Sequence, residues 1–90
     1  MNKFSYDILN SAYQNVKNHN STYCELVMDY SPNELLNYIN AAYSLIDFSF
    51  VRRADDDTFL DSSFSYPPIF KFFITSDGIQ HFVSEWNSQD

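Results

Sequence analysis

The chain has 90 residues, and its 12 acidic residues outnumber its 5 Lys and Arg residues, which gives a formal net charge of −7 at pH 7. This length predicts one domain over residues 1–90, and an aromatic content of 19% supplies enough apolar surface for a compact core without disulfides. The lone cysteine, Cys24, cannot form an internal bridge and is expected to be buried. Because the chain has neither a secretory signal pattern nor a run of about 18 apolar residues, we expect a soluble cytoplasmic protein, in the host cytoplasm if it is phage-encoded.

The acidic residues concentrate in the C-terminal half of the chain. Residues 1–53 contain five acidic and four basic residues, whereas residues 54–90 contain seven acidic residues and one basic residue. A surface built from the second half would repel phosphate.

Two helices and a third, shorter one are expected in the first half. The first spans residues 5–17 and has an apolar stripe at helical spacing, made of Phe4, Ile8, Leu9, Ala12, Tyr13 and Val16. Residues 22–30 are read as a short helix, because Thr22 and Glu25 fit a capping box; a strand suits Val27 and Tyr30 equally well.

The next helix, residues 33–46, has the firmest local signal in the chain. Ser31 can cap it, Pro32 takes the first helical position, and Glu34 completes a capping box. The expected buried stripe consists of Leu35, Leu36, Ile39, Ala42, Tyr43 and Ile46. The polar residues expected away from that stripe are Asn33, Asn37, Asn40 and Ser44.

The spacing of the apolar residues then changes to the alternation of a strand. Residues 48–53 and 69–74 are expected to form an antiparallel hairpin with a long tip that contains the acidic turn 54–58. A last helix over residues 76–86 follows, capped by Thr75 or Ser76. Its apolar stripe is Ile79, Phe82, Val83 and Trp86.

This order of elements is that of an α+β, winged helix-turn-helix-like fold, with three to four helices and a two- or three-stranded antiparallel hairpin as the wing. Three sequence features carry a family resemblance: Lys3 followed by Tyr-Asp-Ile-Leu at 6–9, a helix that leads into an apolar strand at 45–51, and Ile-Thr-Ser-Asp-Gly-Ile at 74–79. With these features the chain resembles the small prophage winged-helix proteins of the YjcQ type. That family has a Gly between the middle helix and its strand, where this chain has Asp47 or Phe48.

The sequence offers no enzyme signature, and we expect no enzyme, no metal and no cofactor. His19 and His81 do not have metal-ligand spacing with Cys24, and no phosphate-binding glycine loop or hydrolase motif occurs. The aspartates of the predicted tip lack the central Gly and final Glu of an EF-hand loop. They are Asp55, Asp56, Asp57 and Asp61.

In a winged helix, the helix over residues 33–46 would meet DNA. DNA contact through Asn33, Asn37 and Asn40, with Arg52 and Arg53 on phosphates, is therefore one hypothesis, which describes a transcription regulator and possible homodimer. The acidic tip argues against it.

We favour instead a small acidic protein of a phage or mobile element that binds a protein partner. The partner would be a basic nucleic-acid-handling host or defence protein, which this protein inhibits by phosphate mimicry. The contact residues would be the four tip aspartates with a second patch of Glu34, Asn37 and Asn40, and exposed aromatic side chains would anchor the contact. A self-associating structural or assembly protein is the third hypothesis. No membrane partner is expected.

Overall fold

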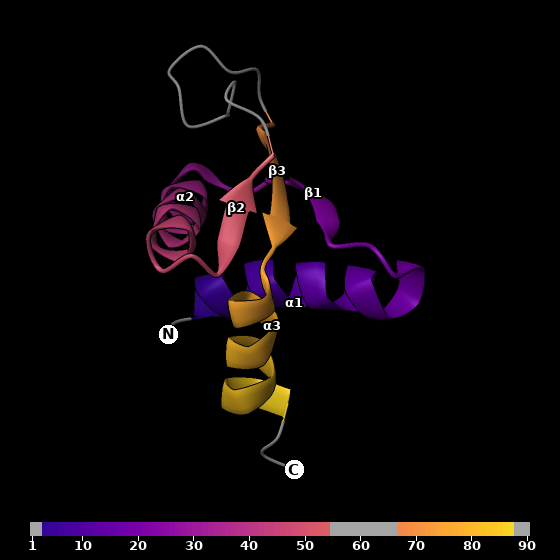
Figure 1. Ribbon diagram of the computed structural model, residues 1–90. Coiled ribbons are helices and arrows are strands. Elements are labelled where there is room, and N and C mark those ends of the chain that lie inside the picture. The colour runs from indigo at the N-terminus through magenta and orange to yellow at the C-terminus, as the bar shows by residue number, and fades with distance from the viewer. Residues whose placement is uncertain (1–2, 55–66, 88–90) are drawn as a thin grey trace.

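The computed structural model describes residues 3–54 and 67–87 and has the α+β architecture expected from the sequence, with three helices and a three-stranded antiparallel sheet (Figure 1). A π-helical segment, Val83–Asn87, continues the last helix. In chain order the elements are α1 (Lys3–His19), β1 (Tyr23–Val27), α2 (Pro32–Asp47), β2 (Val51–Arg53), β3 (Ile69–Ile74) and α3 (Ser76–Phe82). No helix in these two ranges has the length and apolar character needed to cross a membrane.

The expected first helix is confirmed as α1, and its apolar stripe faces the core. Ile8, Leu9 and Ala12 are buried, whereas the remaining members of the stripe are partly buried against the same core. The helix ends at His19, and the next residue, Asn20, has a positive φ of 54°, a conformation that Asn tolerates.

The prediction of a short helix over residues 22–30 is wrong, because Tyr23–Val27 forms the strand β1. Cys24 pairs with Phe72 of β3 and is buried on the core side, as expected, whereas Glu25 pairs with Lys71 on the exposed side. Since pairing with β3 buries alternate residues, it outweighs the local capping pattern of Thr22 and Glu25. The result is a strand at the edge of the sheet.

The sheet has the order β1-β3-β2, so β3 lies in the centre. The predicted antiparallel pairing of β2 with β3 is confirmed, and residues 55–66 of the predicted tip lie outside the described residues. The inner face of the sheet contributes Cys24, Val51, Phe70, Phe72 and Ile74 to the core. Figure 1 shows α2 beside β2, at the opposite side of the sheet from β1.

Helix α2 matches the predicted helix over residues 33–46 to within one residue at each end, but its buried stripe differs from the predicted one. The buried residues are Tyr38, Ala41, Ala42 and Leu45. Leu36 and Tyr43, which were expected to be buried, are exposed. The two adjacent alanines, which lie between Tyr38 and Leu45 in this buried stripe, let the helix approach the core closely.

At the start of α2, Ser31 occupies the N-cap position with extended backbone angles, but its side chain makes no capping hydrogen bond. Pro32 takes the first helical position, as expected. The preorganised backbone of Pro32 thus begins the helix without the predicted capping box.

The strand expected over residues 48–53 contains only Val51–Arg53, because the preceding residues form a helix-ending turn. Ser49 N donates to Ile46 O (3.0 Å) and Phe50 N donates to Leu45 O (2.9 Å), the bond pattern of a Schellman motif. Ser49 has a positive φ of 62°. Ser49, rather than Asp47 or Phe48, therefore holds the position that favours Gly.

The last helix begins as expected, with Thr75 as its N-cap. Thr75 Oγ1 accepts from Gly78 N (3.0 Å) and also donates to Ser49 O (2.7 Å). A Cβ atom on Gly78 would lie 2.0 Å from the carbonyl oxygen of Phe50. The Thr-Ser-Asp-Gly stretch therefore fixes α3 directly against the turn between α2 and β2.

Candidate protein-binding surface

The exposed side of α2 is the main candidate for a binding surface. We call it the α2 outer face, and it consists of Asn33, Leu36, Asn37, Asn40, Tyr43 and Ser44, all of which are exposed. Their spacing places them along one side of the helix. Glu34 is exposed in the first turn, three residues from Asn37 and hence next to it. The sequence-predicted patch of Glu34, Asn37 and Asn40 is thus brought together on the surface.

Leu36 and Tyr43 were missed as candidate surface residues. Leu36 is 60% exposed and Tyr43 is 43% exposed, and Asn40 lies between them at helical spacing. Apolar residues cover more than one side of α2, so spacing alone could not tell the buried side from the exposed one. The usable signal was the Ala41-Ala42 pair, since small residues mark the side on which a helix packs closely.

The opposite side of α2 is fixed by a polar and aromatic cluster at α1. Tyr38 Oη donates to Asp7 Oδ2 (2.6 Å), and the Tyr38 ring stacks on Tyr30, with centroids 3.9 Å apart and planes at 10°. Phe4 packs edge-on against Tyr38 at 4.9 Å. These contacts set the rotation of α2 and thereby hold Leu36 and Tyr43 toward solvent.

Burial raises the pKa of Tyr38 well above its usual 10.0, and the hydrogen bond to Asp7 raises that pKa further. Burial likewise raises the pKa of Tyr30. Both hydroxyls stay protonated near neutral pH, so the cluster acts as a structural contact that joins α1 to α2.

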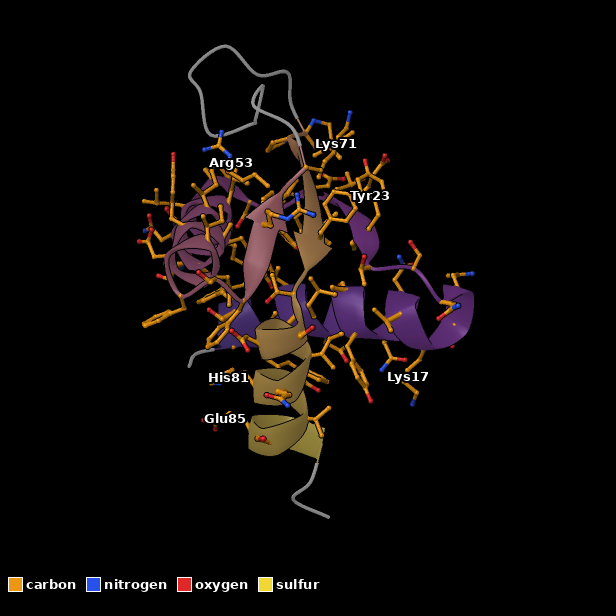
Figure 2. The ribbon with its side chains drawn as sticks, viewed as in Figure 1. Lys17, Tyr23, Arg53, Lys71, His81 and Glu85 are labelled. Atoms are coloured by element: carbon orange, nitrogen blue, oxygen red, sulfur yellow. The ribbon has the colours of Figure 1, made fainter. Side chains whose placement is uncertain are left out.

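Arg52 and Arg53, the phosphate contacts of the DNA hypothesis, lie on opposite faces of the sheet. Arg52 lies on the outer face of the sheet, with its guanidinium 4.7 Å from the centroid of the Phe73 ring. Arg53 pairs with Phe72 in the register and points to the other face. In Figure 2, Arg53 lies on the α2 side of the sheet, whereas Lys71 lies on the β1 side.

The outer face of the sheet carries three rows of side chains across the strands. Tyr23, Phe73 and Arg52 form the first row, in which the Tyr23 and Phe73 ring centroids are 5.3 Å apart. Glu25 and Lys71 form the second row. The third row consists of two exposed apolar residues, Val27 and Ile69.

The remaining residues considered in the sequence are the four tip aspartates and the lone cysteine. Asp55, Asp56, Asp57 and Asp61 fall outside the described residues. Burial, followed by the charge of Glu25, raises the pKa of the Cys24 thiol, so this sulfur stays protonated near neutral pH. Within residues 3–54 and 67–87, no group of three His, Cys, Asp or Glu side chains could hold a metal ion.

Comparisons with known proteins assign no family to this arrangement. No protein-family model matches the chain, and searches of curated proteins and of solved structures found no match.

Proposed function

We propose that the protein is a winged-helix-like domain that binds a protein partner through the α2 outer face. The partner class is a basic, nucleic-acid-handling protein, which the acidic domain would inhibit by occupying the groove meant for phosphates. The resemblance to small prophage proteins fits an origin in a phage or mobile element. The acidic residues of the predicted tip would extend the contact.

The winged-helix frame is supported by the order of the elements and of the strands. One helix and one strand precede α2, a hairpin follows it, and β1 joins the hairpin beside β3. A helix-turn-helix needs a helix joined to the recognition helix by a short turn. Here β1 and the segment after it precede α2, so the frame lacks that supporting helix.

The observation that carries the proposal is the composition of the α2 outer face. The helix contains Glu34 and Asp47 but no Lys, Arg or His, so it offers no charged donor to a phosphate. It does offer Leu36 and Tyr43 as exposed apolar groups surrounded by amides. An apolar centre with a polar rim is typical of protein interfaces.

The first test is fluorescence anisotropy with a labelled random-sequence duplex at low and near-physiological salt. We expect no binding at either salt concentration. Binding that weakens as salt is added would restore the DNA hypothesis, because release of counterions from phosphates produces that dependence.

The second test is affinity capture from a bacterial lysate with the double variant Leu36→Asn and Tyr43→Ser. Its matched control is Ile69→Ser, which also removes an exposed apolar side chain but lies on the sheet. We expect the double variant to lose a partner that wild type and control both retain. A partner retained equally by all three proteins would contradict the assignment to α2. Sedimentation of the wild-type protein at high concentration tests the self-assembly hypothesis, and a monomer would count against it.

A further inference from the structure

The sheet has a free edge away from α2, and its backbone groups form a second candidate surface. The strand order β1-β3-β2 makes β1 and β2 the two edge strands. The β2 edge lies beside α2, whereas no described element lies beyond β1 (Figure 1). An open edge of this kind offers backbone groups with which another strand can pair.

Two hydrogen bonds fix which backbone groups of β1 point outward. Ile74 N donates to Thr22 O (3.0 Å), and Met28 N donates to Pro68 O (2.8 Å). In an antiparallel ladder, every second residue bonds to the neighbouring strand, so the even-numbered residues of β1 bond to β3. The N–H and C=O groups of Glu25 and Val27 therefore point away from the sheet.

Helix α1 closes one end of this edge, and within residues 3–54 and 67–87 no element covers the other end. Asn15 of α1 donates its side-chain amide to Tyr23 O, which satisfies the outward carbonyl at the start of β1. Glu25 and Val27 are both exposed, and the Val27 side chain is 51% exposed. The open part of the edge is thus the stretch from Glu25 to Val27.

Charge decides what kind of strand fits there. Tyr23 Oη donates to Glu25 Oε2 (2.8 Å), which orients the carboxylate on the outer face of the sheet. A Lys or Arg on an added strand opposite Glu25 would place that carboxylate between two cations, since Lys71 is its neighbour in β3. Apolar side chains on the same strand would meet Tyr23 and Val27.

A second copy of this protein fits poorly at the same edge. The antiparallel register that overlaps all of β1 with its two-fold mate sets Glu25 opposite Glu25, and like charges directly opposite each other destabilise a sheet. Each chain also carries a net charge of −7. The edge therefore selects a basic partner over self-association.

We propose that the β1 edge accepts an extended segment of another protein as an added strand. This segment would have a basic residue opposite Glu25 and apolar residues two positions before and after it, which face Tyr23 and Val27. This surface is separate from the α2 outer face and goes beyond the function proposed above.

The test selects peptides from a displayed library of random dodecapeptides against the full chain. Binding of the selected peptides is then measured for wild type, Val27→Pro and Val27→Thr. Proline removes the outward N–H of Val27, whereas threonine keeps both this N–H and a β-branched side chain. We expect the selected peptides to have alternating apolar residues around a Lys or Arg. Val27→Pro should bind these peptides at least tenfold more weakly than wild type, and Val27→Thr should bind them with the affinity of wild type.

Two further variants separate this surface from the α2 outer face. Glu25→Lys should reverse the preference for a basic residue, and Leu36→Asn should leave peptide binding intact. Peptides that bind Val27→Pro as tightly as wild type, or an enrichment of no peptide, would overturn the proposal. Peptides lost only in Leu36→Asn would support the α2 outer face and overturn the β1 edge, and a dimer dissociated by Val27→Pro would show that a second copy occupies the edge.

Discussion

Backbone groups are hydrogen-bonded within the protein at the junction of α2, β2 and α3. By contrast, some backbone groups of the edge strand β1 point to solvent. At the junction, the carbonyl oxygen of Phe50 accepts from Thr75 N (3.1 Å), and the Thr75 side chain also accepts from Gly78 N (3.0 Å). At the edge, the backbone groups of Glu25 and Val27 point away from the sheet. The chain thus places specific residues where the backbone must be fixed and leaves exposed backbone where a partner strand can pair.

The largest expected effect is at the junction. Gly78→Ala should destabilise the fold by about 3 kcal/mol, because the new Cβ would lie 2.0 Å from a backbone oxygen that cannot rotate away. Urea unfolding followed by circular dichroism measures the loss. Ser76→Ala, an exposed change in the same turn, is the control, and equal stability of the two variants would contradict the close approach seen at Gly78.

Loss of the Thr75 hydroxyl should have the next largest effect. Thr75→Ala removes the N-cap of α3 and the bond to Ser49 O (2.7 Å), so we expect a loss of about 1–2 kcal/mol. Thr75→Ser keeps the hydroxyl and should recover most of that loss. Equal unfolding midpoints for the Ala and Ser variants would mean that the hydroxyl does not fix the junction.

The α1–α2 contact should respond to alkaline pH. The folded pKa of Tyr38 is raised above its unfolded value near 10.0, so its contribution to stability is constant at lower pH. Above about pH 10 the unfolded chain loses this proton first, and wild type should lose up to about 1.4 kcal/mol per pH unit through Tyr38.

Tyr38→Phe should be less stable than wild type near neutral pH by about 1 kcal/mol, because it removes the bond to Asp7. That difference should shrink as pH rises above about 10, in urea titrations of both proteins. A constant difference across the alkaline range would show that the hydroxyl of Tyr38 keeps an ordinary pKa in the folded protein.

One substitution in the turn after α2 should stabilise the fold. Ser49→Gly should raise the free energy of unfolding by about 0.5–1 kcal/mol, since glycine adopts a φ of 62° without the strain that a side chain adds. Thermal unfolding measures the gain. Ser44→Gly, at an exposed position in the last turn of α2, should instead lower stability, and a loss at both positions would refute the strain at Ser49.

The smallest expected effect is at the open edge. Val27→Pro should change stability by less than about 0.5 kcal/mol, because the N–H that it removes points away from β3. The control Leu26→Pro should be much more destabilising than Val27→Pro, since the N–H that it removes lies in the ladder. Hydrogen exchange should show the same alternation, with slow exchange at Cys24 and Leu26 and fast exchange at Glu25 and Val27.

Two Ser/Thr-x-x-Glu stretches show how far local sequence patterns can be trusted. The one that begins at Ser31 precedes a helix, because Pro32 favours the first helical turn and Leu and Ala residues follow. The one that begins at Thr22 leads into a strand, because β3 offers it a partner. The capping pattern was the same, and the tertiary partner decided the outcome.

The candidate surface was predicted only in part. The exposure of Glu34, Asn37 and Asn40 followed from their polarity and spacing, and the structure confirms it. The exposure of Leu36 and Tyr43 did not follow, because α2 has apolar residues on more than one side and only packing against α1 and β2 selects between them.

The sequence by itself determined α1, α2, β3 and α3, because helical spacing, Pro32, the alternation of β3 and the capping Thr75 are local signals read within a few residues. It also determined the acidic net charge of the chain and the absence of Lys, Arg and His side chains from α2. Only the tertiary structure decided that residues 23–27 pair with β3 and which side of α2 faces the core. Both depend on contacts between residues far apart in the chain, such as Tyr38 with Asp7, and no local pattern encodes such contacts.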